Sequence, residues 1–182
     1  MTDLLIVVDM QRDFVSGALG SEQARAIVPA VAARIQQAKA ENTQVVFTLD
    51  THEKNYMNTR EGRFLPVPHC IRGTWGHALA DGLTVRAEAG RIEKPTFGST
   101  ALGELVRSRF AAGEIDRVEL VGLCTDICVI SNALLCKAFC PELPVSVDAA
   151  CCAGVTPENH RNALSAMQCC QIDVLNIAPD AK

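Results

Sequence analysis

Cys128 is the residue of this chain best placed to act as a nucleophile. It lies in the segment VGLCTDICV, where an apolar run ends at Leu123 and a helix is expected to follow. Unpaired backbone N–H groups and the helix dipole stabilise negative charge in the first turn of a helix, which favours a thiolate at Cys128. The same N–H groups would bind the oxyanion of a tetrahedral intermediate. A buried structural cysteine is the alternative interpretation of this position.

A cysteine nucleophile needs a base, and no histidine follows a predicted strand with a carboxylate to orient it. Asp9 and Lys94 each lie at the end of a predicted strand. Because parallel strands end at one edge of a sheet, both side chains can converge with Cys128. Lys94 would lower the pKa of the thiol, and Asp9 would move the proton. Taken alone, Asp9 also fits a loop cap and Lys94 a surface lysine.

Four residues around the long segment 51–75 have side chains that bind divalent metals. They are Asp50, His52, Glu61 and His69. Asp50 and His52 are separated by one residue at the end of a predicted strand, so both can reach one ion. Zinc suits this mixed set of nitrogen and oxygen ligands, and manganese or iron would also fit. Solvated or core side chains are the alternative interpretation.

The hydrophobic pattern alternates between strands and helices. The predicted strands are Leu4–Asp9, Gln44–Asp50, Arg91–Lys94, Arg117–Leu123, Pro144–Asp148 and Ile172–Ile177, and the predicted helices are 22–40, 100–112, 126–140 and 157–169. A short apolar segment surrounds Val85, and 51–75 has no sustained period. This alternation predicts an α/β fold of the Rossmann-like kind, a three-layer αβα sandwich with a central, mostly parallel six-stranded sheet.

Composition excludes several classes of protein. The 182 residues include 17 Lys and Arg against 21 Asp and Glu, a net charge of −4, and no basic stripe, which excludes nucleic acid or an anionic membrane as the main partner. No glycine-rich phosphate loop occurs, so we expect no nucleotide cofactor. The length indicates one domain, residues 1–182, with the loop at about 51–75 as its metal-binding segment.

The nine cysteines have to be interpreted together with the cellular compartment. The start of the chain, MTDLLIVVDMQRDF, has neither the cationic segment of a signal peptide nor an apolar run long enough to span a membrane. We therefore expect a cytoplasmic protein with reduced thiols. An odd number of cysteines without a C-x-x-C pair fits small buried side chains better than disulfides or a zinc knuckle. The adjacent pairs Cys151-Cys152 and Cys169-Cys170 leave a non-catalytic metal- or thiol-binding protein as an alternative.

Four separate segments carry a resemblance to a known family. They are LLIVVDMQRDFVSGALG, LDTHEKN, EKPTFGSTALGEL and VGLCTDICVISNA, spread from about residue 4 to residue 150. On these segments the chain resembles the isochorismatase-like cysteine hydrolases and, within them, the nicotinamidases. The end of the chain fits the family only as a terminal helix and strand.

The resemblance implies roles for the candidate catalytic residues. The family uses Asp, Lys and Cys in that order along the chain, and Asp9, Lys94 and Cys128 occupy those places. It also implies a cis peptide bond between Leu123 and Cys124, which turns the backbone amides of Cys124 and Cys128 toward the oxyanion. Non-proline cis bonds are rare, so this is a specific expectation.

The resemblance also supports a metal centre. Nicotinamidases hold one divalent metal with an Asp-x-His pair and a later His, in some members with an acidic residue between them. Asp50, His52, Glu61 and His69 match these positions. Relatives that act on isochorismate, ureidoacrylate or carbamoyl compounds generally lack these ligands, whereas a metal beside the pocket can hold a pyridine nitrogen. The four ligands together therefore favour nicotinamide as substrate.

The function implied is hydrolysis of nicotinamide to nicotinate and ammonia through a cysteine thioester, a step of NAD salvage. The alternative is a related cysteine hydrolase acting on another small amide, ureide or isochorismate-like substrate. Phe14 and Phe97, close in sequence to Asp9 and Lys94, are candidates to sandwich the ring, with Trp75 as a third wall. Core packing is the other explanation of these aromatic residues. His77 and His160 match no motif and are interpreted as surface residues, and family members often form homo-oligomers.

Overall fold

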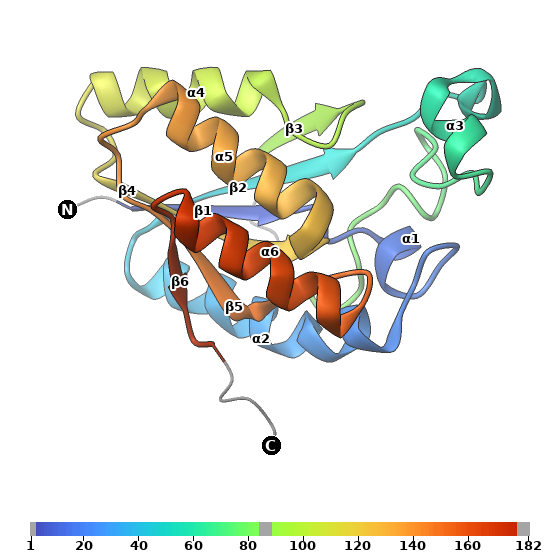
Figure 1. The fold of residues 1–182 in the computed structure, drawn as a ribbon, viewed down its shortest axis with the longest axis horizontal. Helices are drawn as coiled ribbons and strands as arrows, with labels where there is room; N and C mark the ends of the chain where they lie inside the picture. Colours follow the sequence, from blue (N-terminus) through green and yellow to red (C-terminus); the bar gives the residue numbers. More distant parts are fainter. Residues whose placement is uncertain (1–2, 84–88, 178–182) are drawn as a thin grey trace.

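The structure, a computed structural model, describes residues 3–83 and 89–177, and the apolar segment expected around Val85 lies outside this part. Within it, six strands form one parallel sheet in the order β3-β2-β1-β4-β5-β6 (Figure 1). The strands are β1 (Asp3–Val8), β2 (Gln44–Asp50), β3 (Gly90–Lys94), β4 (Arg117–Leu123), β5 (Val145–Ala153) and β6 (Asp173–Leu175).

Helices cover both faces of the sheet, which confirms the predicted αβα sandwich. The helical segments are α1 (Arg12–Val15), α2 (Glu22–Ala40), η1 (Tyr56–Asn58), α3 (Arg60–Phe64), α4 (Thr100–Ala111), η2 (Thr125–Val129), α5 (Ile130–Phe139) and α6 (Pro157–Cys169). Helix α2 packs on one face, and α4, α5 and α6 pack on the other (Figure 1). In the described part of the chain, no helix has the length and apolar character needed to cross a membrane.

Local sequence explains why these elements form. In β1, Leu4–Val8 are fully buried because the strand lies at the centre of the sheet with helices on both faces, so its apolar run is continuous. In α2, Ile27, Val31 and Ile35 recur every fourth residue and turn one stripe toward the sheet. Ser21 caps this helix by accepting a hydrogen bond from the backbone N–H of Ala24 at 3.0 Å.

Most predicted bounds agree with the structure, and the differences have local causes. Strand β5 continues past the predicted end at Asp148, because after a register shift its residues Cys152 and Ala153 pair with Gly122 and Leu123 of β4. Strand β6 is shorter than predicted and is followed by Asn176, whose φ of 52° leaves the extended conformation. Helix α1 was not predicted, because four residues form only one turn and show no period.

The predicted helix 126–140 begins differently from an ordinary α-helix. Its first part is η2, a π-helical turn over Thr125–Val129, and the α-helix α5 starts only at Ile130. A single wide turn leaves no signature in the hydrophobic pattern, because its apolar positions continue those of the helix behind it. Cys128 therefore lies in the turn that precedes α5.

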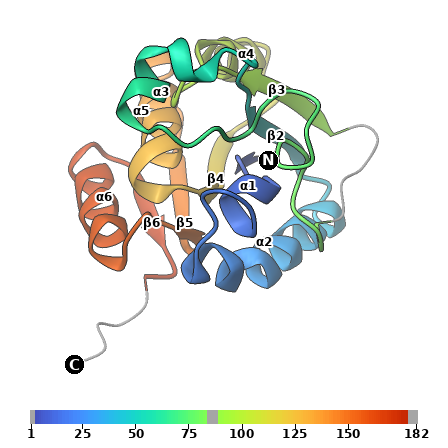
Figure 2. The same cartoon turned by 90° about the vertical axis from the view of Figure 1, so that its right-hand side faces the viewer.

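The carboxyl ends of β1, β2, β3 and β4 lie at one edge of the sheet. Helices α1 and α3 and the connections around them lie beyond this edge (Figure 1), and Figure 2 views the molecule from that side. Residues that directly follow neighbouring strands are thereby brought together, although they are far apart in sequence.

Gly122 allows two central strands to approach closely beside this edge. It pairs with Val8 of β1, has a φ of 118°, and follows a register shift between β4 and β5. A Cβ atom at this position would lie 2.1 Å from the carbonyl oxygen of Val8. Only glycine avoids both the backbone strain and this clash.

We predict that Gly122→Ala lowers the free energy of unfolding by about 3 kcal/mol, because left-handed strain adds to an overpacked contact. Gly113→Ala is the matched control: its φ is 69°, but a Cβ there would meet nothing within 4 Å. The control should lose only about 1 kcal/mol, the cost of the conformation alone. Equilibrium urea unfolding measures both values, and equal losses would contradict the role of the β4–β1 contact.

Candidate active site

Lys94 connects the residues expected to form the catalytic group. It ends β3, and its ammonium is buried with 1% of the side chain exposed. Its Nζ lies 2.6 Å from Asp9 Oδ2 and 3.4 Å from Cys128 Sγ, and it donates to the carbonyl oxygen of Thr96 at 3.1 Å. The structure thus brings Asp9, Lys94 and Cys128 together, with the three donors of the ammonium directed at three partners.

Asp9 directly follows β1 in a conformation that turns the chain away from the sheet. Its φ is 47°, unusual for a residue other than glycine. Its carboxylate is fully buried, with Oδ2 at Lys94 and Oδ1 accepting a hydrogen bond of 2.6 Å from the Thr48 hydroxyl. Both oxygens of the carboxylate are therefore held by named partners.

The charges of the group favour proton transfer by Asp9. Burial raises the pKa of Asp9 above its ordinary value, against the opposing effect of the Lys94 ammonium. Burial alone would lower the pKa of Lys94, but Asp9, Cys128 and Asp50 together raise it, so Lys94 stays protonated. A carboxylate with a raised pKa beside a permanent cation is suited to accept and release a proton.

The Cys128 thiol differs from the expectation drawn from the sequence. Burial raises its pKa well above the ordinary value, the Asp9 carboxylate adds to this effect, and Lys94 offsets it only in part. The resting side chain is therefore a thiol, and the expected lowered pKa is wrong. Loss of water around the sulfur and a neighbouring carboxylate both disfavour the thiolate.

A tight connection joins β4 to Cys128. The peptide bond between Leu123 and Cys124 is cis, which confirms the expectation from the resemblance. The backbone N–H groups of Ile127 and Val129 both donate to the Cys124 carbonyl oxygen at 3.0 Å. These bonds form the turn that places Cys128 over the end of the sheet.

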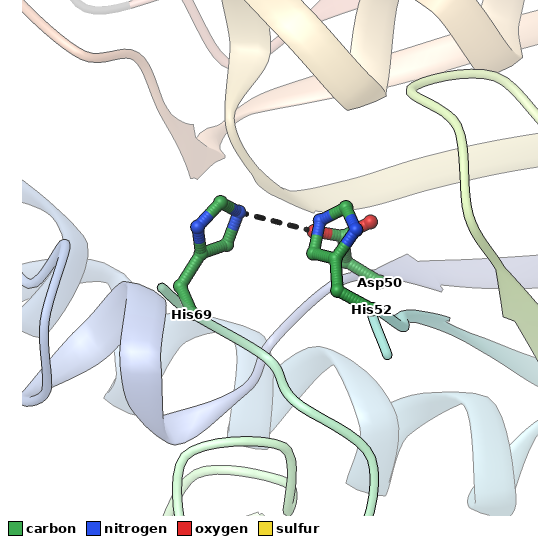
Figure 3. A group of neighbouring side chains, drawn as sticks. All are labelled: Asp50, His52 and His69. Atoms are coloured by element: carbon green, nitrogen blue, oxygen red, sulfur yellow. Dashed lines mark ion pairs between the residues drawn. The ribbon is translucent and has the colours of Figure 1, made fainter. Parts of the chain in front are cut away.

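A second cluster lies next to the catalytic group. The ligand atoms of Asp50, His52 and His69 lie within 4.8 Å of one another, and all three residues are buried (Figure 3). His52 Nε2 is 3.0 Å and His69 Nε2 is 3.5 Å from Asp50 Oδ2. Glu61 Oε1 lies 3.6 Å from His52 Nε2 and 3.8 Å from His69 Nε2. Three of the four predicted metal ligands therefore converge, and the fourth, Glu61, lies against the two imidazoles.

The hydrogen bonds of this cluster fit a cation. His69 Nδ1 donates to the carbonyl oxygen of Val67 at 2.8 Å, so the lone pair of the neutral ring is on Nε2, facing Asp50. His52 Nε2 is buried without a hydrogen-bond partner among the described residues. Ring nitrogens and carboxylate oxygens that converge in this way repel one another unless a proton or metal ion lies between them.

The loop after β2 holds the two imidazoles against a buried tyrosine. The Tyr56 ring lies 4.7 Å from the His52 ring and 5.0 Å from the His69 ring, and its hydroxyl donates to the Leu65 carbonyl at 2.9 Å. His52 also pairs with the segment after His69, because its N–H donates to the Cys70 carbonyl at 3.0 Å. The two ligand-bearing segments therefore form one packed unit.

The predicted aromatic walls are placed differently from one another. Phe14 lies beside the metal-ligand cluster, with its ring 5.5 Å from that of His69. Phe97 is about half exposed on the loop after β3. Trp75 is 56% exposed, and its ring packs under the Arg12 guanidinium at 5.3 Å. Of these three predicted walls, Phe14 is therefore the one that a ring contact connects to the ligand cluster.

His77 and His160 are not the free surface residues expected from the sequence. Both are partly buried. His77 Nε2 lies 2.9 Å from the Thr51 hydroxyl, and His160 Nδ1 lies 2.8 Å from the Thr125 hydroxyl. Each ring therefore packs beside a segment of the site without entering the ligand cluster of Figure 3.

Two fully buried polar residues that hold the site were not identified from the sequence. Thr48 donates to Asp9, and Asn132 Nδ2 donates to the Cys128 carbonyl oxygen at 2.8 Å. The spacing along the sequence indicates that both residues lie near the site. Thr48 precedes Asp50 by two residues and shares its face of β2, and Asn132 follows Cys128 by four residues, one helical turn.

A groove of about 530 Å³ opens beside the two clusters. His52, Glu61, Lys94 and Pro95 contribute to its lining. Its walls combine the metal-ligand loop with the end of β3. The groove reaches His52, Glu61 and the end of β3, whereas Asp9 and Cys128 are not among its lining residues and only 1% of the Lys94 side chain is exposed.

Comparisons with known proteins agree with this geometry. A model of the isochorismatase domain matches residues 3–178. The uncharacterised isochorismatase family protein PncA of Bacillus subtilis (strain 168) is 29% identical over 175 residues, covering 91% of this chain and 93% of the relative.

Two solved structures are similar over nearly the whole chain. The pyrazinamidase of Pyrococcus horikoshii in complex with zinc has a TM-score of 0.83 and 29% identity, covering 97% of this chain and 100% of that chain. The pyrazinamidase/nicotinamidase of Streptococcus mutans UA159 has a TM-score of 0.82 and 27% identity, covering 96% and 100%. Because the family model spans most of the sequence, the chain belongs to the isochorismatase family of hydrolases.

Proposed function

We propose that the protein is a metal-dependent nicotinamidase that hydrolyses nicotinamide to nicotinate and ammonia, the role in NAD salvage that the resemblance implies. The observation that carries this proposal is the placement of a ligand cluster beside an Asp–Lys–Cys group, with Lys94 Nζ only 3.7 Å from Asp50 Oδ1. Similar solved structures are described as nicotinamidases or pyrazinamidases, and one of them contains zinc.

The first half of the proposed reaction forms a thioester. Cys128 Sγ attacks the carboxamide carbon while Asp9 takes the thiol proton, since burial and the Asp9 carboxylate raise the pKa of Cys128 and keep the resting thiol protonated. Negative charge develops on the carboxamide oxygen, which the backbone N–H groups of Cys124 and Cys128 receive. Asp9 then gives the proton to the leaving nitrogen, so that ammonia departs and the acyl group stays on sulfur.

The second half hydrolyses the thioester. Asp9, ionised again, takes a proton from a water molecule that attacks the acyl carbon. The C–S bond breaks, Asp9 returns its proton to the Cys128 sulfur, and the product leaves as nicotinate once its carboxyl group releases the second proton of the water to solvent. Lys94 stays charged throughout and holds Asp9 Oδ2 at 2.6 Å, so the base keeps its place during both halves.

Asp50, His52 and His69, with Glu61 beside them, would hold one divalent cation, for which zinc suits the donor set. Bound there, the cation would act as a Lewis acid toward the ring nitrogen of the substrate and so orient the ring. Phe14, adjacent to His69, would pack against that ring, with Phe97 on the loop after β3 as a second wall.

We predict that the protein releases ammonia from nicotinamide and pyrazinamide at least about tenfold faster than from benzamide, which lacks the ring nitrogen. A carbamoyl compound such as N-carbamoylsarcosine tests the alternative substrate class. Ammonia release is measured for each compound with and without a chelator. Equal rates on benzamide, or preference for the carbamoyl compound, would contradict the proposed substrate.

We predict that Cys128→Ala lowers kcat to less than about a hundredth of the wild-type value, because no other group can form the thioester. Binding of nicotinamide, measured by calorimetry, should change little, since the thiol bonds to the substrate only during the reaction. Cys170→Ala is the control, because this exposed cysteine lies outside the site. Residual activity above that limit would reject Cys128 as the nucleophile.

We predict that His52→Ala removes the bound metal and most of the activity, because one of the imidazole ligands is lost. Metal content after dialysis is measured by mass spectrometry. His160→Ala should retain the metal, because its ring bonds to Thr125 and lies outside the ligand cluster. Full metal content in His52→Ala would show that the cluster is not the metal site.

A further inference from the structure

The segment that follows Asp9 packs behind the metal-ligand loop. Gln11 is fully buried, and its side chain is hydrogen-bonded to the backbone of Asp50. Gln11 Oε1 accepts a hydrogen bond from the Asp50 N–H at 2.7 Å, and Nε2 donates to the Asp50 carbonyl at 2.9 Å. The second hydrogen of Nε2 goes to the His77 carbonyl at 2.9 Å. One side chain thus binds both backbone groups of a ligand residue.

Gln11 takes the place of a missing strand partner. The pairing between β1 and β2 ends at Val8 and Thr48, because the chain turns away at Asp9. Asp50, two residues beyond Thr48, is paired on its other side with Lys94 of β3. Without Gln11, the side of the Asp50 backbone that faces β1 would be buried with unpaired polar groups.

Asp13 holds the second ligand segment in a similar way. Its Oδ2 accepts a hydrogen bond of 2.7 Å from the N–H of Cys70, the residue directly after His69. The Asp13 N–H donates to the Gly76 carbonyl at 3.1 Å. A Cβ atom on Gly76 would lie 2.0 Å from Asp13 Oδ2, so the carboxylate fits only because this residue is glycine.

We infer that Gln11 and Asp13 are positioning residues of the metal centre, Gln11 for Asp50 and Asp13 for His69. The inference rests on the metal site of the proposed function. Both residues act through the backbone, since their side chains bond to main-chain groups at or next to a ligand. They hold the ligand-bearing segments in place before a metal binds. Hydrogen bonds that orient the ligands of a metal, without touching the metal, strongly affect its affinity.

The test measures metal affinity directly, with zinc and cobalt in competition with a chromophoric chelator. Gln11→Leu should weaken binding by about tenfold or more, because it removes three hydrogen bonds at nearly constant volume. Gln44→Leu is the matched control: it removes the bonds of Gln44 to Arg109 and Glu114 at the other end of β2. The control should bind both metals as the wild type does.

A second pair of variants keeps the inference testable if Gln11→Leu does not fold. Asp13→Ala should weaken metal binding by about tenfold, and Asp13→Asn should recover most of the loss, since its amide oxygen can accept from Cys70. The visible spectrum of bound cobalt reports ligand geometry. It should change in Asp13→Ala and stay close to wild type in Asp13→Asn.

The outcomes separate this inference from the proposed function. Wild-type affinity and an unchanged cobalt spectrum in Gln11→Leu and Asp13→Ala would overturn the positioning roles and leave the nicotinamidase proposal intact. Weaker metal binding in Gln11→Leu and Asp13→Ala, together with a wild type that hydrolyses no nicotinamide, would support the positioning roles and reject the substrate. A wild-type protein that binds neither metal would overturn both the metal site and the inference.

Discussion

The site depends on one buried cation. Taking an ammonium out of water costs several kcal/mol unless its charge and all of its hydrogens are matched. Lys94 meets this requirement with Asp9 at 2.6 Å, Cys128 at 3.4 Å, the Thr96 carbonyl at 3.1 Å and Asp50 at 3.7 Å. The proposed base, the proposed nucleophile and a proposed metal ligand therefore surround the same charge. Loss of either carboxylate would leave part of that charge unmatched.

A parallel sheet makes this convergence possible and partly predictable. Apolar runs indicated the strands, and residues directly after parallel strands meet at one edge, so Asp9 and Lys94 were expected to converge with Cys128. The pairing of Asp50 with Lys94 and of Val8 with Gly122 shows that neighbouring strands do end together. The assignment of roles came from the resemblance, because spacing alone left a structural cysteine as an equal alternative at Cys128.

Other features could not be predicted, because they depend on contacts between distant segments. The ionisation of Cys128 is set by its burial and by Asp9, which is 119 positions away in sequence. The hydrogen bonds that join Thr48 to Asp9 and Gln11 to Asp50 depend on the point at which β1 turns away while β2 continues. Trp75, expected to line the pocket, instead packs against Arg12. A sequence pattern gives the face of an element, but not the partner on that face.

The two oxygens of Asp50 explain why the clusters act as one site. Oδ2 faces His52 and His69, whereas Oδ1 faces the Lys94 ammonium. A substitution of Asp50 therefore disturbs the metal ligands and the catalytic cation together, and its effects cannot be assigned to either. The salt bridges of His52 stay within the ligand cluster, so its removal tests the metal alone. Because β2 carries Thr48 and Asp50 on one face, one residue bonds to the proposed base and the other belongs to the proposed metal-ligand cluster.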